Sequence, residues 1–393
     1  MKLIVVGLGQ AGSRIADEFA RINKRAQSQR GIEICPGIFA VNTDAADLTG
    51  LTTIEPDYQH RILIGGRKTG GHGVGKINEL GAEVARADAD KVIDALRSAR
   101  HFYEADAFLL AASSAGGTGS GSISIIAQRI KERYPDKPLY SLLALPFEHE
   151  RDTEERASYN SAVCLKSIYS ISDCVFLVDN QRYVMKDSSL GNNMSRINEL
   201  IVEPFYDLLC AGEEKNPRFI GAKTLDAGDI IQTLSGWSVL GSGQSDLSKS
   251  FSLFERSNDF RKKTSETHKG IQAMDEAISE MSLKCNPKDA GRAIYLVSAP
   301  PKEMNMDMMR ELNEWMRELC PNAIIRNGDY PRGSNRLTVT VILSELSDVE
   351  RVRNFYADSL SLIPVIKQRQ VELRHKLEDI NDMGRDIPSL LED

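Results

Sequence analysis

A glycine-rich run between an apolar stretch and a helix-like stretch has the composition of an anion-binding loop. Glycines let the backbone approach a bound group closely, and the N-terminus of the following helix presents unpaired N–H groups at the positive end of its dipole. Because a linker would not lie between a buried strand and a buried helix, we interpret the run as a phosphate site. Its residues are Gly116, Gly117, Thr118, Gly119, Ser120 and Gly121.

Two further glycine-rich loops follow apolar strands. Residues 7–12 read GLGQAG, which fits the GxGxxG pattern, and residues 69–75 read TGGHGVG. One such loop, with an acidic residue about 20 residues further on, would indicate a dinucleotide-binding Rossmann domain. Here the second strand ends late, at residues 42–44, and three loops suit a triphosphate better than a pyrophosphate. A Rossmann-type NAD-dependent oxidoreductase stays as the alternative.

The elements expected around these loops form a parallel sheet. Apolar runs such as KLIVVGLG, GIFAVNTD and DAFLLAAS alternate with helix-like stretches at 78–98, 122–134 and 155–171. This alternation is typical of a parallel sheet that helices cover on both faces. Ligands of such sheets bind beyond the carboxyl ends of the strands, where the glycine loops fall. We therefore expect an α/β, Rossmann-like domain with its site at that edge.

The pattern changes in the second half of the chain. Apolar residues recur at helical spacing over 193–210, and Pro204 should kink this helix or split it. Residues 220–243 predict a loop, a helix and then a glycine-rich turn. The helices and strands that follow indicate a second, mixed α/β domain. The charged, mostly helical segment 351–393 is expected to pack on this domain or to project from it.

Length and composition bound the class of protein. A chain of 393 residues exceeds the ~250–300 residues at which one core stops growing, so we expect two domains. No apolar run approaches the ~18–20 residues that span a bilayer, and no leader pattern is visible, which predicts a cytoplasmic protein without membrane insertion. A net charge of −7 without a basic stripe argues against a nucleic-acid partner. Six scattered cysteines without a CxxC pair predict reduced core residues.

Taken in order along the chain, these motifs resemble the tubulin/FtsZ superfamily of polymerising GTPases. The family signature GGGTGSG appears at residues 115–121, with Ala115 in place of the first glycine. GQAG after the first strand is similar to the tubulin form of that loop, and VNTDAADL to the bacterial FtsZ form. HGVGKINELGAEVA resembles the archaeal CetZ group, as does the length without an FtsZ-type tail. The resemblance implies GTP and GDP as ligands, together with Mg²⁺.

The resemblance also assigns roles around the phosphates. Asp44 would act near the Mg²⁺ or its waters, although from sequence alone it could equally cap the following helix. Gly73 and Gly75 would lie beside the terminal phosphate, or simply form a loop. The residues implied around the inner phosphates are Gln10, Ala11, Gly12, Ser13, the backbone of Arg14, Gly116, Gly117, Thr118, Gly119 and Ser120.

Other positions are implied for the sugar and the base. Glu150, four residues past the proline that ends the ALP strand, would bind the ribose. Asn180 and Asn198 would offer amide donors and acceptors to guanine. Met194 would cover the base, or serve as ordinary core filler. The competitors of Glu150 in the same charged segment are Asp152, Glu154 and Glu155.

Asp226 and Asp229 stand three apart at the start of an expected helix. Acidic residues are common in a first helical turn, so capping is the plain interpretation. The resemblance implies another role, in which both acids enter the pocket of an adjacent subunit and orient the attacking water. Thr224 replaces the asparagine of the family's NxDxxD pattern there. A nucleotide-binding filament protein with little hydrolysis is therefore a further alternative.

Such a shared active site implies that the partner is a second copy of the same chain. Head-to-tail contacts generate an open filament, whose expected role is in cell shape or division. The resemblance divides the chain into a GTP-binding domain (1–191), a central helix (192–211), a second, GTPase-activating domain (212–350) and a C-terminal helical segment (351–393). The sequence does not identify accessory cytoskeletal partners.

Overall fold

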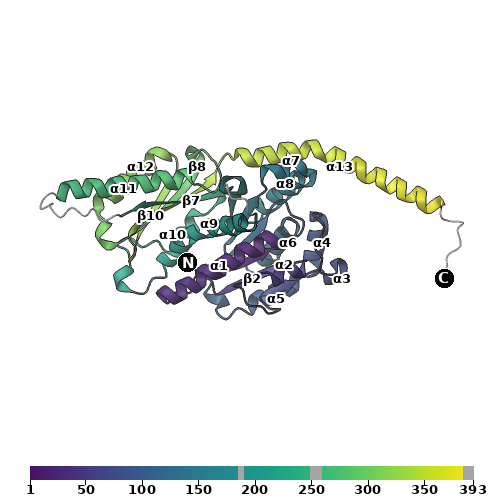
Figure 1. Cartoon of the computed structure of the whole chain (residues 1–393), viewed down its shortest axis with the longest axis horizontal. Helices are drawn as coiled ribbons and strands as arrows, with labels where there is room; N and C mark the ends of the chain where they lie inside the picture. The colour runs from purple at the N-terminus through teal and green to yellow at the C-terminus, as the bar shows by residue number, and fades with distance from the viewer. Residues whose placement is uncertain (185–189, 248–258, 384–393) are drawn as a thin grey trace.

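The computed structural model describes residues 1–184, 190–247 and 259–383 (Figure 1). Within these residues, ten strands form one sheet in the order β3-β2-β1-β4-β5-β6-β7-β10-β8-β9. The strands are β1 (Leu3–Leu8), β2 (Gly37–Asn42), β3 (Arg61–Leu63), β4 (Ala107–Ser113), β5 (Leu139–Leu145), β6 (Cys174–Asp179), β7 (Gly236–Asp246), β8 (Ala290–Ala299), β9 (Ile324–Pro331) and β10 (Arg336–Leu346).

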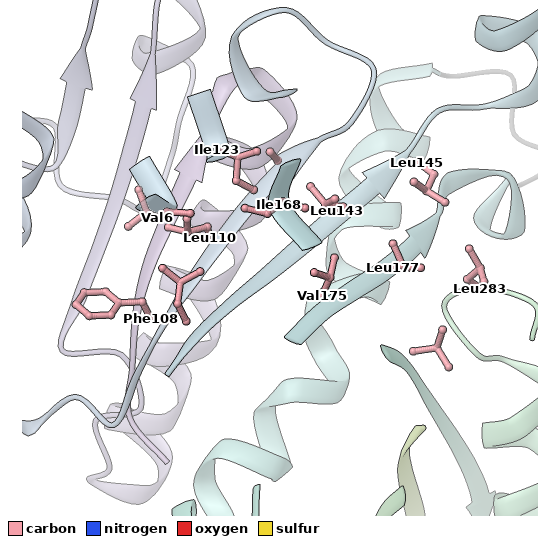
Figure 2. Packing of buried hydrophobic residues seen from close by; sticks show 14 of the residues in the cluster. Val6, Phe108, Leu110, Ile123, Leu143, Leu145, Ile168, Val175, Leu177 and Leu283 are labelled. Carbon is pink, nitrogen blue, oxygen red and sulfur yellow. The ribbon is translucent and has the colours of Figure 1, made fainter. Parts of the chain in front are cut away.

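Strands β1 to β6 run parallel, as the sequence predicts. In β1, Val5 pairs with Ile38 of β2 on one side and with Leu109 of β4 on the other. Successive residues of β1 alternate between two buried clusters, so Val5 belongs to one cluster and Val6 to the other. Figure 2 shows the cluster that contains Val6. Burial on both faces explains why these strands are apolar throughout.

Helices cover both faces of the sheet (Figure 1). Three short helices, α2 (Ala45–Thr49), α3 (Gly66–Thr69) and α7 (Glu148–Thr153), follow β2, β3 and β5. The cluster with Val5 is covered by α1 (Gly9–Arg30), α9 (Leu190–Ala211) and α10 (Ala227–Thr233). The cluster with Val6 is covered by α4 (Asn78–Ala87), α5 (Ala89–Arg97), α6 (Thr118–Arg133), α8 (Glu155–Tyr169), α11 (Asp259–Ser279), α12 (Met306–Leu319) and the start of α13 (Glu350–Met383).

The glycine-rich turn predicted near residue 240 is wrong, because those residues form strand β7. This strand begins in parallel pairing with β6 and continues in antiparallel pairing with β10, so it joins the two halves of the sheet. Its glycines allow α11 to approach. A Cβ atom at Gly241 would lie 2.0 Å from the carbonyl oxygen of Ala277, and one at Gly243 would lie 2.1 Å from that of Ala273. Close helix–strand packing, rather than a turn, requires these glycines.

Two of the described helices, α9 and α13, are long. Helix α9 runs from Leu190 to Ala211 without being split at Pro204. Helix α13 starts against α8, and its Arg351 Nε lies 3.5 Å from Oδ2 of Asp179 at the end of β6. Its later turns project from the body (Figure 1). In the described part of the chain, every helix is too short or too polar to cross a lipid bilayer.

Candidate functional site

A cavity of about 360 Å³ lies at the carboxyl ends of β1, β2, β4 and β6. Leu8, Asn42 and Ser113 bring the ends of three of these strands into its wall. This edge is where sheets of this type bind ligands, as the sequence predicts. The cavity brings together many of the predicted residues, namely Gln10, Ala11, Asp44, Gly73, Gly116, Gly117, Thr118, Gly119, Glu150, Asn180 and Met194.

Strands β1 and β4 are each followed by a glycine loop, and the two loops contact each other. Gly9 has a left-handed backbone with φ of 71°, and a Cβ atom there would lie 2.7 Å from the amide nitrogen of Gly119. A Cβ atom at Gly119 would lie 2.8 Å from the carbonyl oxygen of Leu8. Helix α6 begins at Thr118, so its first N–H groups lack helical partners at the cavity wall. The two loops therefore form a surface lined by backbone amides, which is the arrangement that suits an anion.

Several predicted phosphate residues lie outside the lining of the cavity. A Cβ atom at Gly12 would lie 2.1 Å from the carbonyl oxygen of Ala111, so this glycine allows α1 to pack on β4. Ser13 is buried with an unpartnered hydroxyl among the described residues, and the side chain of Arg14 is exposed. The hydroxyl of Ser120, in the first turn of α6, donates to the carbonyl oxygen of Gly116 in the preceding loop.

Asp44 caps a helix, which is one of the two roles that the sequence left open. Its Oδ1 accepts hydrogen bonds from the N–H groups of Ala46 at 2.9 Å and Asp47 at 3.2 Å, and so caps α2. Its Oδ2 lies 3.8 Å from the position of a Cβ atom at Gly73, and both residues line the cavity. One carboxylate oxygen is therefore used by the fold, and the other faces the loop expected at the terminal phosphate.

Polar residues around Asp44 were missed by sequence reasoning. Asn42 and Asp47 both line the cavity, and Asn42 Nδ2 donates to Asp47 Oδ2 at 3.0 Å. Gln10 Nε2 donates to Asp47 Oδ1 at 2.8 Å, which links the first loop to helix α2. Both missed residues flank Asp44 within VNTDAADL, so their nearness to Asp44 in the sequence could have identified them as candidate site residues.

The loop at 69–75 contributes to the cavity wall, and several of its residues have a left-handed backbone conformation. Gly73 and Gly75 have φ of 80° and 57°, and the next residue, Lys76, has φ of 61° although it is not a glycine. Lys76 lines the cavity together with Gly73, whereas Gly75 lies outside the lining. A Cβ atom at Gly117 would lie 2.9 Å from Cα of Lys76, so this turn packs directly on the signature loop.

The charged segment after β5 contributes two carboxylates to the cavity, from Glu150 and Glu154. Glu150 Oε2 also accepts a hydrogen bond from the N–H of Phe147 at 3.1 Å, which fixes the first turn of α7. Asp152 is exposed, with 70% of its side chain accessible. Glu155 begins α8. Among the described side chains of this segment, those of Glu150 and Glu154 line the cavity.

Two of the three residues expected at the base, Asn180 and Met194, line the cavity. Asn180 follows β6 at the start of a 3₁₀ turn and is buried. Burial raises the pKa of the preceding Asp179, against the lowering effect of Arg351. Met194 lines the cavity from the second turn of α9. Asn198 is buried one turn further along α9, outside the lining.

Asp226 and Asp229 lie at the start of α10. Asp226 Oδ1 accepts a hydrogen bond from the N–H of Asp229 at 2.9 Å, so it caps the helix. Asp229 Oδ1 lies 3.3 Å from Nε of Arg326 on β9. The preceding loop is held by Asp329, whose carboxylate accepts hydrogen bonds from the N–H groups of two consecutive residues, 222 and 223, at 3.0 and 2.6 Å.

Helix α9 separates these acids from the cavity. Met194 lines the cavity near the start of the helix, and Gly212 directly follows its end. A Cβ atom at Gly212 would lie 2.9 Å from the carbonyl oxygen of Leu225 and 3.1 Å from Cα of Asp226. The rise of about 1.5 Å per helical residue places Met194 and Gly212 roughly 27 Å apart. The acids of one chain therefore do not reach its own cavity.

Comparison with known proteins agrees with this architecture. Residues 2–185 match the model of the Tubulin/FtsZ family, GTPase domain, and residues 187–360 match that of the Tubulin-like CetZ, C-terminal domain. The tubulin-like protein CetZ1 of Haloferax volcanii is 30% identical, over 97% of this chain and 94% of the relative.

Two solved structures extend the likeness to the whole fold. The GDP-bound CetZ1 monomer of Haloferax volcanii has a TM-score of 0.77 and 28% identity, covering 92% of this chain and 99% of that one. The GTPγS-bound CetZ2 protofilament of the same organism has a TM-score of 0.78 and 28% identity, covering 93% and 100%. The sheet and its glycine loops define a tubulin/FtsZ-type GTPase fold. This chain belongs to the CetZ group of that family.

Proposed function

We propose that this protein binds GTP in the cavity, assembles head to tail and hydrolyses GTP where two subunits meet. The observation that carries the proposal is the separation of the cavity from Asp226 and Asp229 by the length of α9. Each chain has a pocket at one end and a pair of acids at the other. A second copy is needed to bring them together, and repetition of that contact builds a filament. The protofilament of the similar CetZ2 supports this arrangement.

Within the pocket, the phosphates bind the loop amides of Gln10, Ala11 and the 116–119 run. Glu150 binds the ribose, with Glu154 as its competitor. Asn180 binds the guanine edge, because an amide offers both a donor and an acceptor. Met194 covers the base. The predicted residues outside the lining, Gly12, Ser13, Arg14, Gly75, Ser120 and Asn198, act by supporting these loops and α9.

Mg²⁺ fits the chemistry of this pocket. Among the described residues, the ionisable side chains of the lining are four carboxylates and one lysine, so the charge of a triphosphate is not neutralised by the protein. Oxygen ligands suit this hard cation, and Asp44 Oδ2 is the oxygen available to hold it or its waters. The ion supplies charge neutralisation on the phosphates. Asp44 remains the cap of α2 in this role.

At the contact, Asp226 and Asp229 of one subunit orient the water that attacks the terminal phosphate of the next. Their carboxylates are fixed by the α10 cap and by Arg326, which holds them in place before assembly. Positioning is the main contribution that a protein makes to phosphoryl transfer. GDP is then the product, and its presence weakens the contact.

A concentration series tests this function. Protein with GTP and Mg²⁺ should pellet on high-speed centrifugation, and protein with GDP should stay in the supernatant. Phosphate release per chain should rise with protein concentration, because each active site needs two subunits. Turnover per chain that is equal in dilute and concentrated protein would contradict the proposal. Pelleting without phosphate release would favour the filament protein with little hydrolysis.

We also propose how the chain is divided into domains and where in the cell the filament acts. Residues 1–191 are the GTP-binding domain, 192–211 the central helix, 212–350 the GTPase-activating domain and 351–393 the C-terminal segment. We place the filament in the cytoplasm, where GTP is supplied, with a role in cell shape or division. Localising a fluorescently tagged chain in cells, with the Asp229→Asn variant as the control, tests this part.

A further inference from the structure

Lys76 has an unusual backbone for a lysine. Its φ of 61° lies in the left-handed region, where a side chain is strained and glycine is favoured. A hydrogen bond to its carbonyl oxygen stabilises this backbone conformation. The buried side chain of Asn160 donates from Nδ2 to the carbonyl oxygen of Lys76 at 2.9 Å and to that of Ala115 at 2.9 Å. Lys76 is therefore fixed to the first residue of the signature loop.

The side chain of Lys76 provides the positive charge of the cavity. Among the described lining residues it is the lone cation, against the carboxylates of Asp44, Asp47, Glu150 and Glu154. Its Nζ pairs with Glu154, which lies across from the 69–75 loop on the segment after β5. This ion pair links two loops of the cavity wall that are 78 residues apart in sequence.

That ion pair is weakly held. The side chains of Lys76 and Glu154 are 55% and 37% exposed, so water screens their attraction. A phosphate group carries more negative charge than a carboxylate and offers several acceptor oxygens to an ammonium group. The flexible stem of lysine lets the ammonium move between acceptors while its backbone stays fixed beside Gly117.

We propose that Lys76 exchanges Glu154 for the terminal phosphate of a bound nucleoside triphosphate. This inference rests on the function proposed above and names a specificity-determining residue within the same pocket. With a diphosphate the Lys76–Glu154 pair persists, and with a triphosphate it opens and frees Glu154. Lys76 thereby sets the preference of the pocket for triphosphate over diphosphate, and the pair reports which nucleotide is bound.

The test compares binding of GTPγS and GDP, with Mg²⁺, by calorimetry on protein dilute enough to stay monomeric. Lys76→Met should weaken GTPγS binding by about tenfold, the effect of losing one charge-assisted hydrogen bond, with little change for GDP. Lys76→Arg should restore most of the loss. Glu154→Gln removes the competing carboxylate, so it should strengthen GTPγS binding relative to GDP. An exchange therefore predicts that Lys76→Met lowers the affinity for GTPγS relative to GDP and that Glu154→Gln raises it.

Lys68→Met is the matched control, because Lys68 pairs with Glu83 at similar exposure in α3, outside the cavity lining. It should leave both affinities unchanged. If Lys76→Met keeps the wild-type ratio of the two affinities, the exchange is wrong and the proposed function stands. If wild-type protein binds neither nucleotide, the proposed function itself fails. Thermal unfolding of each variant without nucleotide shows whether it is folded, and Glu154→Gln tests the exchange should Lys76→Met be unstable.

Discussion

Gly116 and Gly117 are neighbours in the signature loop, yet a Cβ atom would meet different surroundings at each. At Gly116, no described heavy atom lies within 4 Å of that position, and the residue lines the cavity. At Gly117, the Cβ atom would lie 2.6 Å from a methyl group of Val74 and 2.9 Å from Cα of Lys76. The first glycine keeps space free for a ligand, and the second lets the 74–77 turn pack on the loop.

Gly116→Ala should therefore separate ligand binding from stability. The added methyl group enters the space of a phosphate, so affinity for GDP should fall by about tenfold, or ~1.4 kcal/mol. The free energy of unfolding without nucleotide should stay equal or rise by up to about 1 kcal/mol, because alanine restricts the unfolded chain. Calorimetric binding and urea unfolding measure the two quantities. Unchanged GDP affinity would show that this loop is not the phosphate site.

Gly117→Ala should behave in the opposite way. Its methyl group meets backbone atoms that cannot move aside freely, so the free energy of unfolding should fall by about 1–3 kcal/mol. Urea unfolding without nucleotide, run beside Gly116→Ala, gives the comparison. Equal stability of the two alanine variants would contradict the packing described for the 74–77 turn.

Asp226→Asn and Asp229→Asn should remove hydrolysis while filaments still form. Asparagine caps a helix about as well as aspartate, so Asp226→Asn keeps the start of α10 and loses only the charge. Phosphate release at high protein concentration should drop by about 10²-fold for each variant, the usual size of a general-base or positioning contribution. Asp246→Asn, an exposed carboxylate paired with Arg336, is the control and should hydrolyse GTP normally. Wild-type turnover in Asp229→Asn would exclude its proposed role.

Mixing two defective variants tests whether the active site is shared. Asp229→Asn has an intact pocket, and Gly116→Ala has intact acids but binds nucleotide poorly. In an equal mixture, roughly one quarter of random head-to-tail contacts join the good pocket to the good acids. Phosphate release by the mixture should exceed the mean of the two separate proteins. A mixture that matches that mean would mean that each chain hydrolyses GTP within itself.

The sequence was sufficient for the parallel half of the fold and for the glycine loops, because both are local patterns. Apolar runs ending in glycine predict a strand and its turn without knowledge of any distant residue. The pairing of Lys76 with Glu154 could not be predicted, because it depends on two loops that meet only after the sheet has formed.

Some local patterns were ambiguous for a physical reason. Gly241 and Gly243 indicated a turn, but they lie in a strand that α11 approaches closely, and glycine serves both needs. Asp44 and Asp226 are similar cases, since each caps a helix and also stands where chemistry is expected. A carboxylate at a helix start suits both roles, and only the surrounding structure shows which of its oxygens the cap uses.

The cysteines should be unreactive in the folded protein at neutral pH. Burial raises the pKa of Cys164, Cys174, Cys210 and Cys320 to about 12, and that of Cys285 to about 11. Burial also raises the pKa of Cys35. Because the thiolate is the reactive form, a pKa of about 12 leaves a thiolate fraction of roughly 10⁻⁴ at pH 8.

A disulfide-exchange reagent such as DTNB measures this reactivity. Native protein should react slowly at pH 8 and faster as the pH rises, whereas unfolding in guanidinium should release six reactive thiols per chain. Rapid modification of one thiol in native protein at pH 8 would contradict the burial of these side chains. Fewer than six thiols after unfolding would indicate a disulfide.

Gly212→Ala should weaken hydrolysis from the far end of α9. The added methyl group would lie 2.9 Å from the carbonyl oxygen of Leu225 and 3.1 Å from Cα of Asp226, so the acid loop must shift. A displacement of this kind should lower phosphate release at high protein concentration by about tenfold or more, because catalysis depends on the position of the acids. GTPγS affinity of the monomer should stay unchanged, since the pocket lies at the other end of the helix. Gly333→Ala adds a methyl group in open space and is the matched control. Weaker nucleotide binding by monomeric Gly212→Ala would show instead that α9 transmits the change to the pocket within one chain.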